Sequence, residues 1–415
     1  MFKRTVLKSG LRIITVPFNS VKAVTVLVLV GTGSKYEIDK ENGISHFLEH
    51  LMFKGTKKRP NALKIAESLD KVGGSFNAFT SKEATGYYAK VDSSHLDLAL
   101  DWVSDMFLNS KLEQKEIKKE KGVILEEMNM RKDIPMSYVM ELFEELLYGN
   151  QPAGWEIIGK KENILRFKRK DFVDYLKSHY SSLNTIVCVS GNFKEKETIE
   201  KLKKYFKKIN KGEVREKLKV IESQKEPKTL VFERETDQTH LCLGVRAFSL
   251  NSPQHYAQEV LSVVLGGNMS SRLFSEIRDK RGLAYYIKTS SETYTDSGYV
   301  FTQAGVPHNK AKQVLSLILK EYKKIKKELS ASELKKAKDY LKGSLILGLE
   351  SSEAKASFFA GQELLSKKVL TVKEKCARID KVKSSEVKNL AREIFSSEKL
   401  NLALIGPHKK DFKAI

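Results

Sequence analysis

Residues 180–191 read YSSLNTIVCVSG, and residues 395–406 read FSSEKLNLALIG. Each stretch is typical of the end of a helix, a short turn, an apolar strand and a terminating glycine. The two stretches lie 215 residues apart, and at the same offset the apolar strand 24–30 matches residues 239–245. Solenoid repeats are about 20–50 residues long, so a repeat of this length indicates two homologous domains instead.

The segments that follow the two apolar strands also match. An amphipathic helix is expected at 44–53 in the first half and at 256–265 in the second. Strands rich in Tyr, Thr and Phe come next, at 76–91 and 283–306. Because strands occur in consecutive pairs with helices between the pairs, we predict an α+β fold. Each domain should be a mostly antiparallel sheet covered by helices on one face.

The boundary between the domains is expected at 211–228. This stretch has few apolar residues and contains Pro227 near its end, which is typical of a linker. We therefore predict a first domain at 1–210 and a homologous second domain at 229–415. A chain of 415 residues with 41% apolar residues has ample material for two packed cores.

The formal net charge of +22 raises the question of a nucleic-acid partner. Most lysines alternate with Glu or Asp at helical spacing, which is typical of solvated helix faces. No basic stripe rich in aromatic residues accompanies them, so we expect no nucleic-acid partner. The longest apolar run, 23–30, is broken only by Thr25 and is far shorter than the roughly 18 residues of a membrane-spanning helix, so we also expect no membrane association.

Cysteine usage and the N-terminal sequence bear on the compartment. The three cysteines are widely spaced and form no CxxC pair, which favours a reducing environment. The first residues, MFKRTVLKSG, lack the apolar core of a secretory signal. We therefore expect a cytoplasmic protein.

Residues 43–53, GISHFLEHLMF, carry the chemistry of the first half. His46 and His50 are i,i+4 neighbours on a helix, so both imidazoles can reach one metal ion. Glu49 lies beside them and can accept a proton from water without being a ligand. The H-x-x-E-H spacing is that of inverted-motif zinc peptidases. The opposite face of the helix is apolar and consists of Ile44, Phe47, Leu48 and Leu51.

A catalytic zinc site needs a third protein ligand and an open position. The expected helix 115–130 offers several carboxylates, of which Glu120 and Glu127 lie two turns apart on one face. Periodicity alone does not choose between Glu126 and Glu127. The matching helix of the second half, 256–265, contains no histidine pair, so we expect one metal site per chain.

Several blocks of the chain together resemble those of a known family. The chain resembles the pitrilysin-type inverted-motif zinc peptidases, in particular the single-unit branch similar to the mitochondrial processing peptidase. The matching blocks extend over nearly the whole chain: 10–12, 31–34, 43–56, 77–80, 120–128, 269–274 and 277–285. The most specific are the histidine block and the last one, IRDKRGLAY.

The resemblance implies a role for each residue of the metal site. The family's two histidine ligands correspond to His46 and His50, and its general base corresponds to Glu49. Its distal glutamate ligand corresponds to Glu127, and the glutamate that supports the site corresponds to Glu120. The implied cofactor is one Zn²⁺ per chain.

The resemblance also implies substrate-binding residues. In the family, an edge strand around an Asn-Ala pair holds an extended substrate by strand addition, and Asn77 and Ala78 match that pair. An arginine and a tyrosine that contact the substrate near the scissile bond match Arg278 and Tyr285. Without the resemblance, these two would be read as a surface cation and a half-buried aromatic residue.

The predicted function is a zinc endopeptidase that hydrolyses short or unstructured polypeptides. One alternative is a presequence-type processing peptidase, which the high positive charge of the chain disfavours. Another is a catalytically silent, peptide-binding scaffold subunit. Relatives of that kind usually lose the motif residues, which this chain keeps. Because longer relatives enclose a chamber with four domains, we expect a homodimer, or a heterodimer with a related subunit.

Overall fold

The computed structural model describes residues 2–212 and 214–412, which form two compact units. Each unit combines three segments of the chain. Unit 1 consists of Met1–Met128, Trp155–Leu218 and Leu347–Leu370. Unit 2 consists of Asn129–Gly154, Lys219–Ile346 and Thr371–Ile415.

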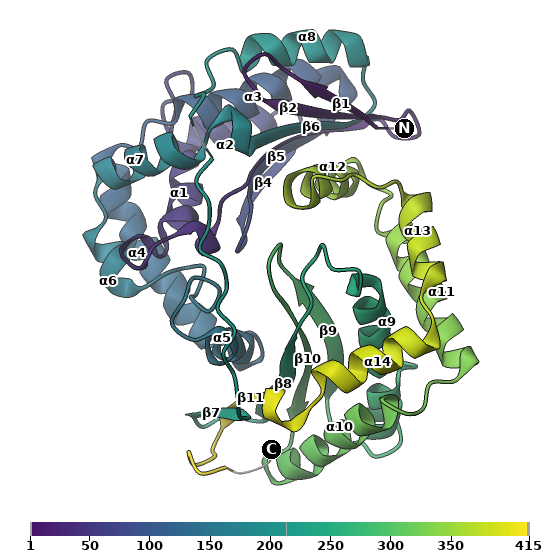
Figure 1. The fold of residues 1–415 in the computed structure, drawn as a ribbon. Helices are drawn as coiled ribbons and strands as arrows, with labels where there is room; N and C mark the ends of the chain where they lie inside the picture. The colour runs from purple at the N-terminus through teal and green to yellow at the C-terminus, as the bar shows by residue number, and fades with distance from the viewer. Residues whose placement is uncertain (1, 213, 413–415) are drawn as a thin grey trace. The chain divides into compact units, whose positions relative to one another are not determined.

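Unit 1 is built on a six-stranded sheet with the order β1-β2-β6-β3-β5-β4 (Figure 1). Neighbouring strands are antiparallel except β2 and β6, which are parallel. The inner strand β3 is almost entirely buried, as its continuous apolar sequence predicts. The strands are β1 (Lys3–Val6), β2 (Arg12–Pro17), β3 (Ala23–Val30), β4 (Ser75–Thr80), β5 (Thr85–Asp92) and β6 (Thr185–Gly191).

Unit 2 is built on a five-stranded sheet with the order β7-β11-β8-β10-β9. This order matches β2-β6-β3-β5-β4 strand for strand, and β7 and β11 are again the one parallel pair. The predicted α+β fold with two homologous domains is therefore confirmed. The strands are β7 (Lys228–Glu233), β8 (Thr239–Ala247), β9 (Tyr286–Thr293), β10 (Gly298–Val306) and β11 (Asn401–Gly406).

Helices cover one face of the first sheet and enclose the larger core of unit 1. Val26 and Val28 of β3 point into this core and meet Phe47 and Trp102. These helices are α1 (Ile44–Met52), α2 (Ala62–Asp70), α3 (Leu96–Asn109), α4 (Gln114–Lys132), α6 (Lys161–Arg166), α7 (Arg169–His179) and α8 (Glu195–Tyr205).

The second sheet is covered in the same way. Leu241 and Leu243 of β8 meet Leu261 and Ile318 in the core of unit 2. The helices on this side are α9 (His255–Gly266), α10 (Ala311–Ile325), α11 (Ala331–Leu347), α13 (Val372–Lys381) and α14 (Ser384–Ile394). Within the described part of the chain, no helix is long and apolar enough to cross a membrane.

The other face of each sheet is covered too, which corrects the expectation of helices on one face only. In unit 1, α12 (Ser352–Gly361) packs on β3 and β6, where Leu27 and Cys188 contact Phe359 and its neighbours (Figure 1). In unit 2, α5 (Pro135–Tyr148) packs on β8 and β11 through Val139 and Phe143. Helix α12 comes from the second half of the sequence and α5 from the first, so the two repeats exchange equivalent helices.

This exchange makes the compact units discontinuous in sequence. The predicted domains, 1–210 and 229–415, are the two halves of the sequence repeat and differ from the compact units. As domain boundaries they stay a prediction. Between them, residues 211–212 and 214–227 contain neither helix nor strand.

Candidate metal centre

Helix α1 carries the histidine motif of unit 1. Its apolar residues Ile44, Phe47 and Leu48 are at most 1% exposed and anchor the helix in the core. Side chains three and four positions apart share a helix face, so His46 and His50 project together from another face. Their ring centroids lie 4.7 Å apart.

A carboxylate from α4 completes the cluster. One ligand atom each of His46, His50 and Glu127 lies within 4.8 Å of the other two, and no other such group of three occurs among residues 2–212 and 214–412. The two Glu127 oxygens lie 3.6 Å from the Nε2 atoms of His46 and His50, respectively. Zinc ligands about 2.1 Å from the ion at a tetrahedral angle are about 3.4 Å apart, so this donor set fits Zn²⁺. Glu126 is exposed and lies outside the cluster.

Glu120 supports the cluster from behind. The Nδ1 atom of His50 lies 3.0 Å from one Glu120 oxygen, which leaves Nε2 free to face the metal position. The Nζ atom of Lys54 lies 2.7 Å from the other oxygen. Burial acts to raise the pKa of Glu120, but the hydrogen bonds from His50 and Lys54 prevail and lower it. Glu120 is therefore held as an anion that fixes the His50 ring.

Glu49 lies on α1 between the two histidines in sequence but is not part of the three-ligand cluster. The hydroxyl of Thr80 donates a 2.5 Å hydrogen bond to Glu49 Oε2. Thr80 is the last residue of strand β4, so the strand and the carboxylate are directly connected.

Asn77 and Ala78 lie in the same strand. Strand β4 is at the edge of the sheet and pairs with β5 alone among the described strands. Asn77 is exposed, whereas Ala78 faces the core. The open side of an edge strand presents backbone N–H and C=O groups that can pair with another extended chain.

Arg278 and Tyr285 belong to unit 2. Arg278 is in the π-helix Phe274–Asp279, and Tyr285 directly precedes β9. The guanidinium carbon of Arg278 lies 5.9 Å from the centre of the Tyr285 ring, a cation–π distance. Tyr285 is 73% exposed, so both side chains are available to a ligand.

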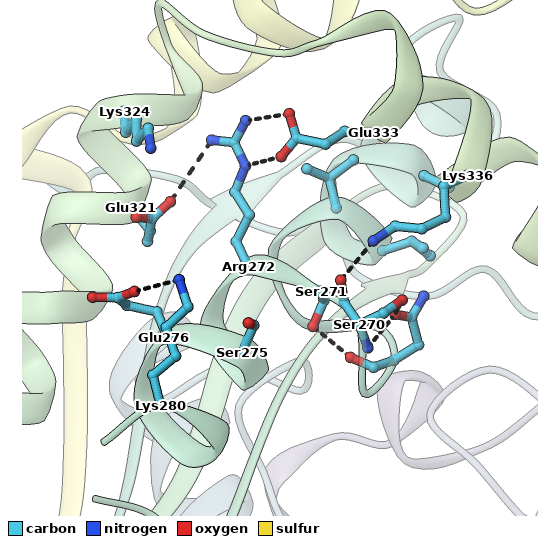
Figure 2. A pocket seen from close by; sticks show the side chains of 14 residues that line it. Ser270, Ser271, Arg272, Ser275, Glu276, Lys280, Glu321, Lys324, Glu333 and Lys336 are labelled. Atoms are coloured by element: carbon cyan, nitrogen blue, oxygen red, sulfur yellow. Dashed lines mark hydrogen bonds and ion pairs between the residues drawn. The ribbon is translucent and has the colours of Figure 1, made fainter. Parts of the chain in front are cut away.

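Ser270, Ser271 and Arg272 belong to the block 269–274, also quoted for the resemblance, and they line a polar pocket of unit 2 with a volume of about 190 Å³ (Figure 2). Its centre is Arg272, whose guanidinium donates bonds of 2.6 and 3.0 Å to Glu333 of α11. Glu321 of α10 lies 3.7 Å from the remaining guanidinium nitrogen. Arg272 therefore ties three helical segments together and holds the start of the segment that carries Arg278.

Two residues of the site were not singled out from the sequence. Thr80 lies within the quoted block 77–80, and Lys54 lies within the block 43–56. The sequence feature that could have identified them is their position: Lys54 lies one helical turn after His50, and Thr80 lies three residues after Asn77. Neither carries a pattern of its own, because Lys and Thr are common surface residues.

Comparisons with known proteins identify the family of the chain. The sequence model described as "Insulinase (Peptidase family M16)" matches residues 12–161, which include α1 and the whole metal cluster. The model described as "Peptidase M16 inactive domain" matches residues 166–341. The second match covers α9, where the histidine pair is absent.

Individual relatives match over nearly the whole length. The zinc protease YmxG of Bacillus subtilis, described as uncharacterised, is 38% identical, and the match covers 98% of each chain. An uncharacterised zinc protease of Rickettsia felis is 33% identical, again over 98% of each. The crystal structure of a protease from Helicobacter pylori superposes with a TM-score of 0.92 at 27% identity, covering 98% of this chain and 99% of that one. At this identity and coverage, the chain belongs to the insulinase or M16 family of zinc proteases, and the match to the family's inactive domain follows the match that contains His46, His50 and Glu127.

Proposed function

We propose that this chain is a zinc-dependent endopeptidase that hydrolyses short or unstructured polypeptides. The observation that carries the proposal is the convergence of three donor atoms, from His46, His50 and Glu127, within 4.8 Å. Two neutral imidazoles and one carboxylate are a donor set typical of catalytic zinc, and three protein ligands leave one position open. The intact set favours a peptidase over a silent scaffold.

Zinc in such a site would polarise the scissile carbonyl and make a water molecule more acidic. Glu49 would take the proton of the attacking water, whose oxygen adds to the carbonyl carbon. As the C–N bond breaks, Glu49 would pass this proton to the leaving amine nitrogen. The hydrogen bond from Thr80 supports this role because it holds the Glu49 carboxylate in one orientation.

The edge strand β4 supports the choice of substrate. An extended polypeptide can add to the open side of β4, where Asn77 and Ala78 would pair with its backbone. Because strand addition requires an extended backbone, folded substrates would be excluded. Thr80 at the end of the same strand would keep the bound chain next to Glu49. Arg278 and Tyr285 would contribute further contacts to the substrate.

Peptide mapping tests this proposal. The wild-type protein and the Glu49→Gln variant are incubated with a mixed peptide library, and the products are identified by mass spectrometry. We expect internal cuts by the wild type, no cuts above background by the variant, and about one zinc per chain in both proteins. A wild type that contains zinc but makes no internal cut in any peptide would contradict the proposal.

A further inference from the structure

A buried acid precedes the metal-bearing helix. Glu37 lies seven residues before the start of α1 and is 1% exposed. One of its oxygens accepts a 2.9 Å hydrogen bond from the backbone N–H of Ser45, and the other accepts a 2.9 Å bond from that of Gly43. The side-chain amide of Asn42 donates a third bond of 3.1 Å. Glu37 therefore holds the first turn of α1.

Helix α1 lacks the usual side-chain cap. Its N-cap residue is Gly43, which has a φ of +101° and no side chain. A Cβ at Gly43 would lie 2.8 Å from the carbonyl oxygen of Ile158, so a Ser or Asp cap does not fit. The free N–H groups at the start of a helix need acceptors, and an anion there also interacts favourably with the helix dipole. Glu37 supplies both from outside the helix.

A second set of bonds fixes the same turn. The Ser45 hydroxyl lies 2.7 Å from the Tyr175 hydroxyl, which in turn lies 2.9 Å from the Thr32 hydroxyl. These side chains are buried and connect α1 to α7 and to the end of β3. Ser45 is thus held at its backbone by Glu37 and at its side chain by Tyr175. His46 is the next residue along the chain.

We propose that Glu37 is a positioning residue for the metal centre, which fixes the first turn of α1 so that His46 meets Glu127 at the spacing of a zinc site. This inference rests on the proposed function, since it concerns the ligands assigned there. Glu37 accepts hydrogen bonds from Asn42, Gly43 and Ser45. It acts through the backbone of Gly43 and Ser45, and its loss should weaken zinc binding rather than proton transfer.

The test measures zinc affinity in Glu37→Gln by competition with a chromogenic chelator. The substitution keeps the shape of the side chain but removes the charge and turns one acceptor into a donor. That donor would then face a backbone N–H. We expect zinc affinity to fall on the order of tenfold, as for other supporting residues around metal ligands. We also expect faster hydrogen exchange at residues 43–47 in the metal-free variant.

Glu363→Gln is the matched control. Glu363 lies in the same unit, is 3% exposed, and accepts a 2.9 Å hydrogen bond from Arg4. It follows α12 on the opposite face of the sheet from α1, so its loss costs a partly buried ion pair without touching the metal helix. We expect its zinc affinity to stay within twofold of wild type. Equal weakening in both variants would show that general destabilisation is the cause.

Two further measurements separate the possible failures. If Glu37→Gln does not fold, Glu37→Asp replaces it, because aspartate keeps the charge but cannot reach both N–H groups. The zinc affinity of Glu37→Asp should be lower than that of the wild type, but by less than tenfold. Wild-type affinity in every folded Glu37 variant would overturn the inference. If the wild type and His46→Ala bound zinc equally well, the proposed function would be overturned instead. Hydrogen exchange at residues 43–47 would still show whether Glu37 stabilises the first turn of α1.

Discussion

Helices α1 and α9 occupy equivalent places in two sheets of the same strand order, but the side chains at equivalent positions differ in polarity. Counted from the first residue of each helix, His46, Glu49 and His50 of α1 match Ala257, Val260 and Leu261 of α9. The three residues of α9 are at most 5% exposed and belong to the core of unit 2. Equivalent helix positions thus hold apolar core residues in unit 2 and polar residues in unit 1.

Helices α4 and α11 show the same contrast. Counted in the same way, Glu120 and Glu127 of α4 match Ala337 and Ser344 of α11. Glu120 and Ala337 are both nearly fully buried, so one position holds a charge in unit 1 and a methyl group in unit 2. Burying a charge is costly unless it is paired, and Glu120 is paired with Lys54 and His50. A few paired polar residues on this shared fold therefore make the candidate metal centre of unit 1.

The largest effect is expected when His46 of α1 is replaced by alanine, the residue that α9 has at the matching position, Ala257. His46→Ala removes one of three ligands, so the protein should lose its zinc and all peptide cleavage. Metal analysis and a peptide assay measure both. His255→Ala in α9 is the control and should keep zinc and activity. If His46→Ala kept its zinc, the proposal that α1 supplies metal ligands and α9 does not would be wrong.

Glu49→Gln should separate chemistry from metal binding. The variant keeps all three ligands and should keep about one zinc per chain. It should lose at least about 100-fold in turnover, because the group that accepts the proton is gone. Steady-state kinetics on a peptide from the mapped library would measure the loss. Cleavage at a near-wild-type rate would show that another group is the base.

A pair of neighbouring carboxylates tests the contribution of α4. Glu127→Gln removes an anionic ligand and should weaken zinc binding by about tenfold or more, whereas Glu126→Gln should leave it unchanged. Both substitutions remove one charge from the same helix, so each is the control for the other in zinc titrations. If Glu126→Gln weakened zinc binding and Glu127→Gln did not, Glu126 would be the ligand that α4 supplies.

A complementation experiment asks whether the two kinds of unit cooperate between two copies of the chain. If a homodimer places the metal centre of one copy against Arg278 of the other, Glu49→Gln and Arg278→Ala should each be nearly inactive alone. After dissociation and mixing, about half of the dimers would be mixed, each with one intact site. The mixture should reach roughly a quarter of wild-type activity. No recovery, with subunit exchange verified, would exclude this arrangement.

The smallest effect on activity is expected in the polar pocket of unit 2. The hydrogen bond from Arg272 lowers the pKa of Glu333 to about 2 from 4.5. The ionised, paired carboxylate therefore stabilises the fold above pH 4.5, and this contribution disappears as the pH falls from 4.5 to about 2. Glu333→Gln should lower the free energy of unfolding by about 1–2 kcal/mol at pH 7, given its partial exposure.

Urea unfolding at pH 7 and pH 3 would measure this contribution. The difference between the wild type and Glu333→Gln should shrink at the lower pH, while zinc content and cleavage at pH 7 should be those of the wild type. A difference that stays constant with pH would mean that the ion pair with Arg272 is not its source.

The parts of the fold that follow from local pattern were predictable. The repeat 180–191 and 395–406 became β6 and β11, each next to the parallel partner of its sheet, and 44–53 and 256–265 became α1 and α9. The exchange of α5 and α12 was not predictable, because an amphipathic helix shows which face is buried but not which sheet buries it.

The candidate site divides in the same way. The i,i+4 spacing of His46 and His50 is local, so their juxtaposition could be predicted. The choice of Glu127 over Glu126 depends on how α4 is rotated against α1, and this rests on long-range packing. Glu37 acts through hydrogen bonds from Gly43 and Ser45, and Thr80 through one to Glu49, so both act on α1 from segments outside it. No periodicity in the sequence marks such residues. The roles of the site residues stay predictions that the variants above test.

The exchanged helix α12 also has a consequence for how the chain is made. The six-stranded sheet of unit 1 has all its strands once residue 191 has left the ribosome, but residues 352–361, which cover its second face, come about 160 residues later. Until then, apolar side chains such as Leu27 and Cys188 face water. Nascent chains with such surfaces aggregate readily and are the usual clients of chaperones. The six-stranded sheet of unit 1 is therefore fully covered only after most of the second half of the chain has been synthesised.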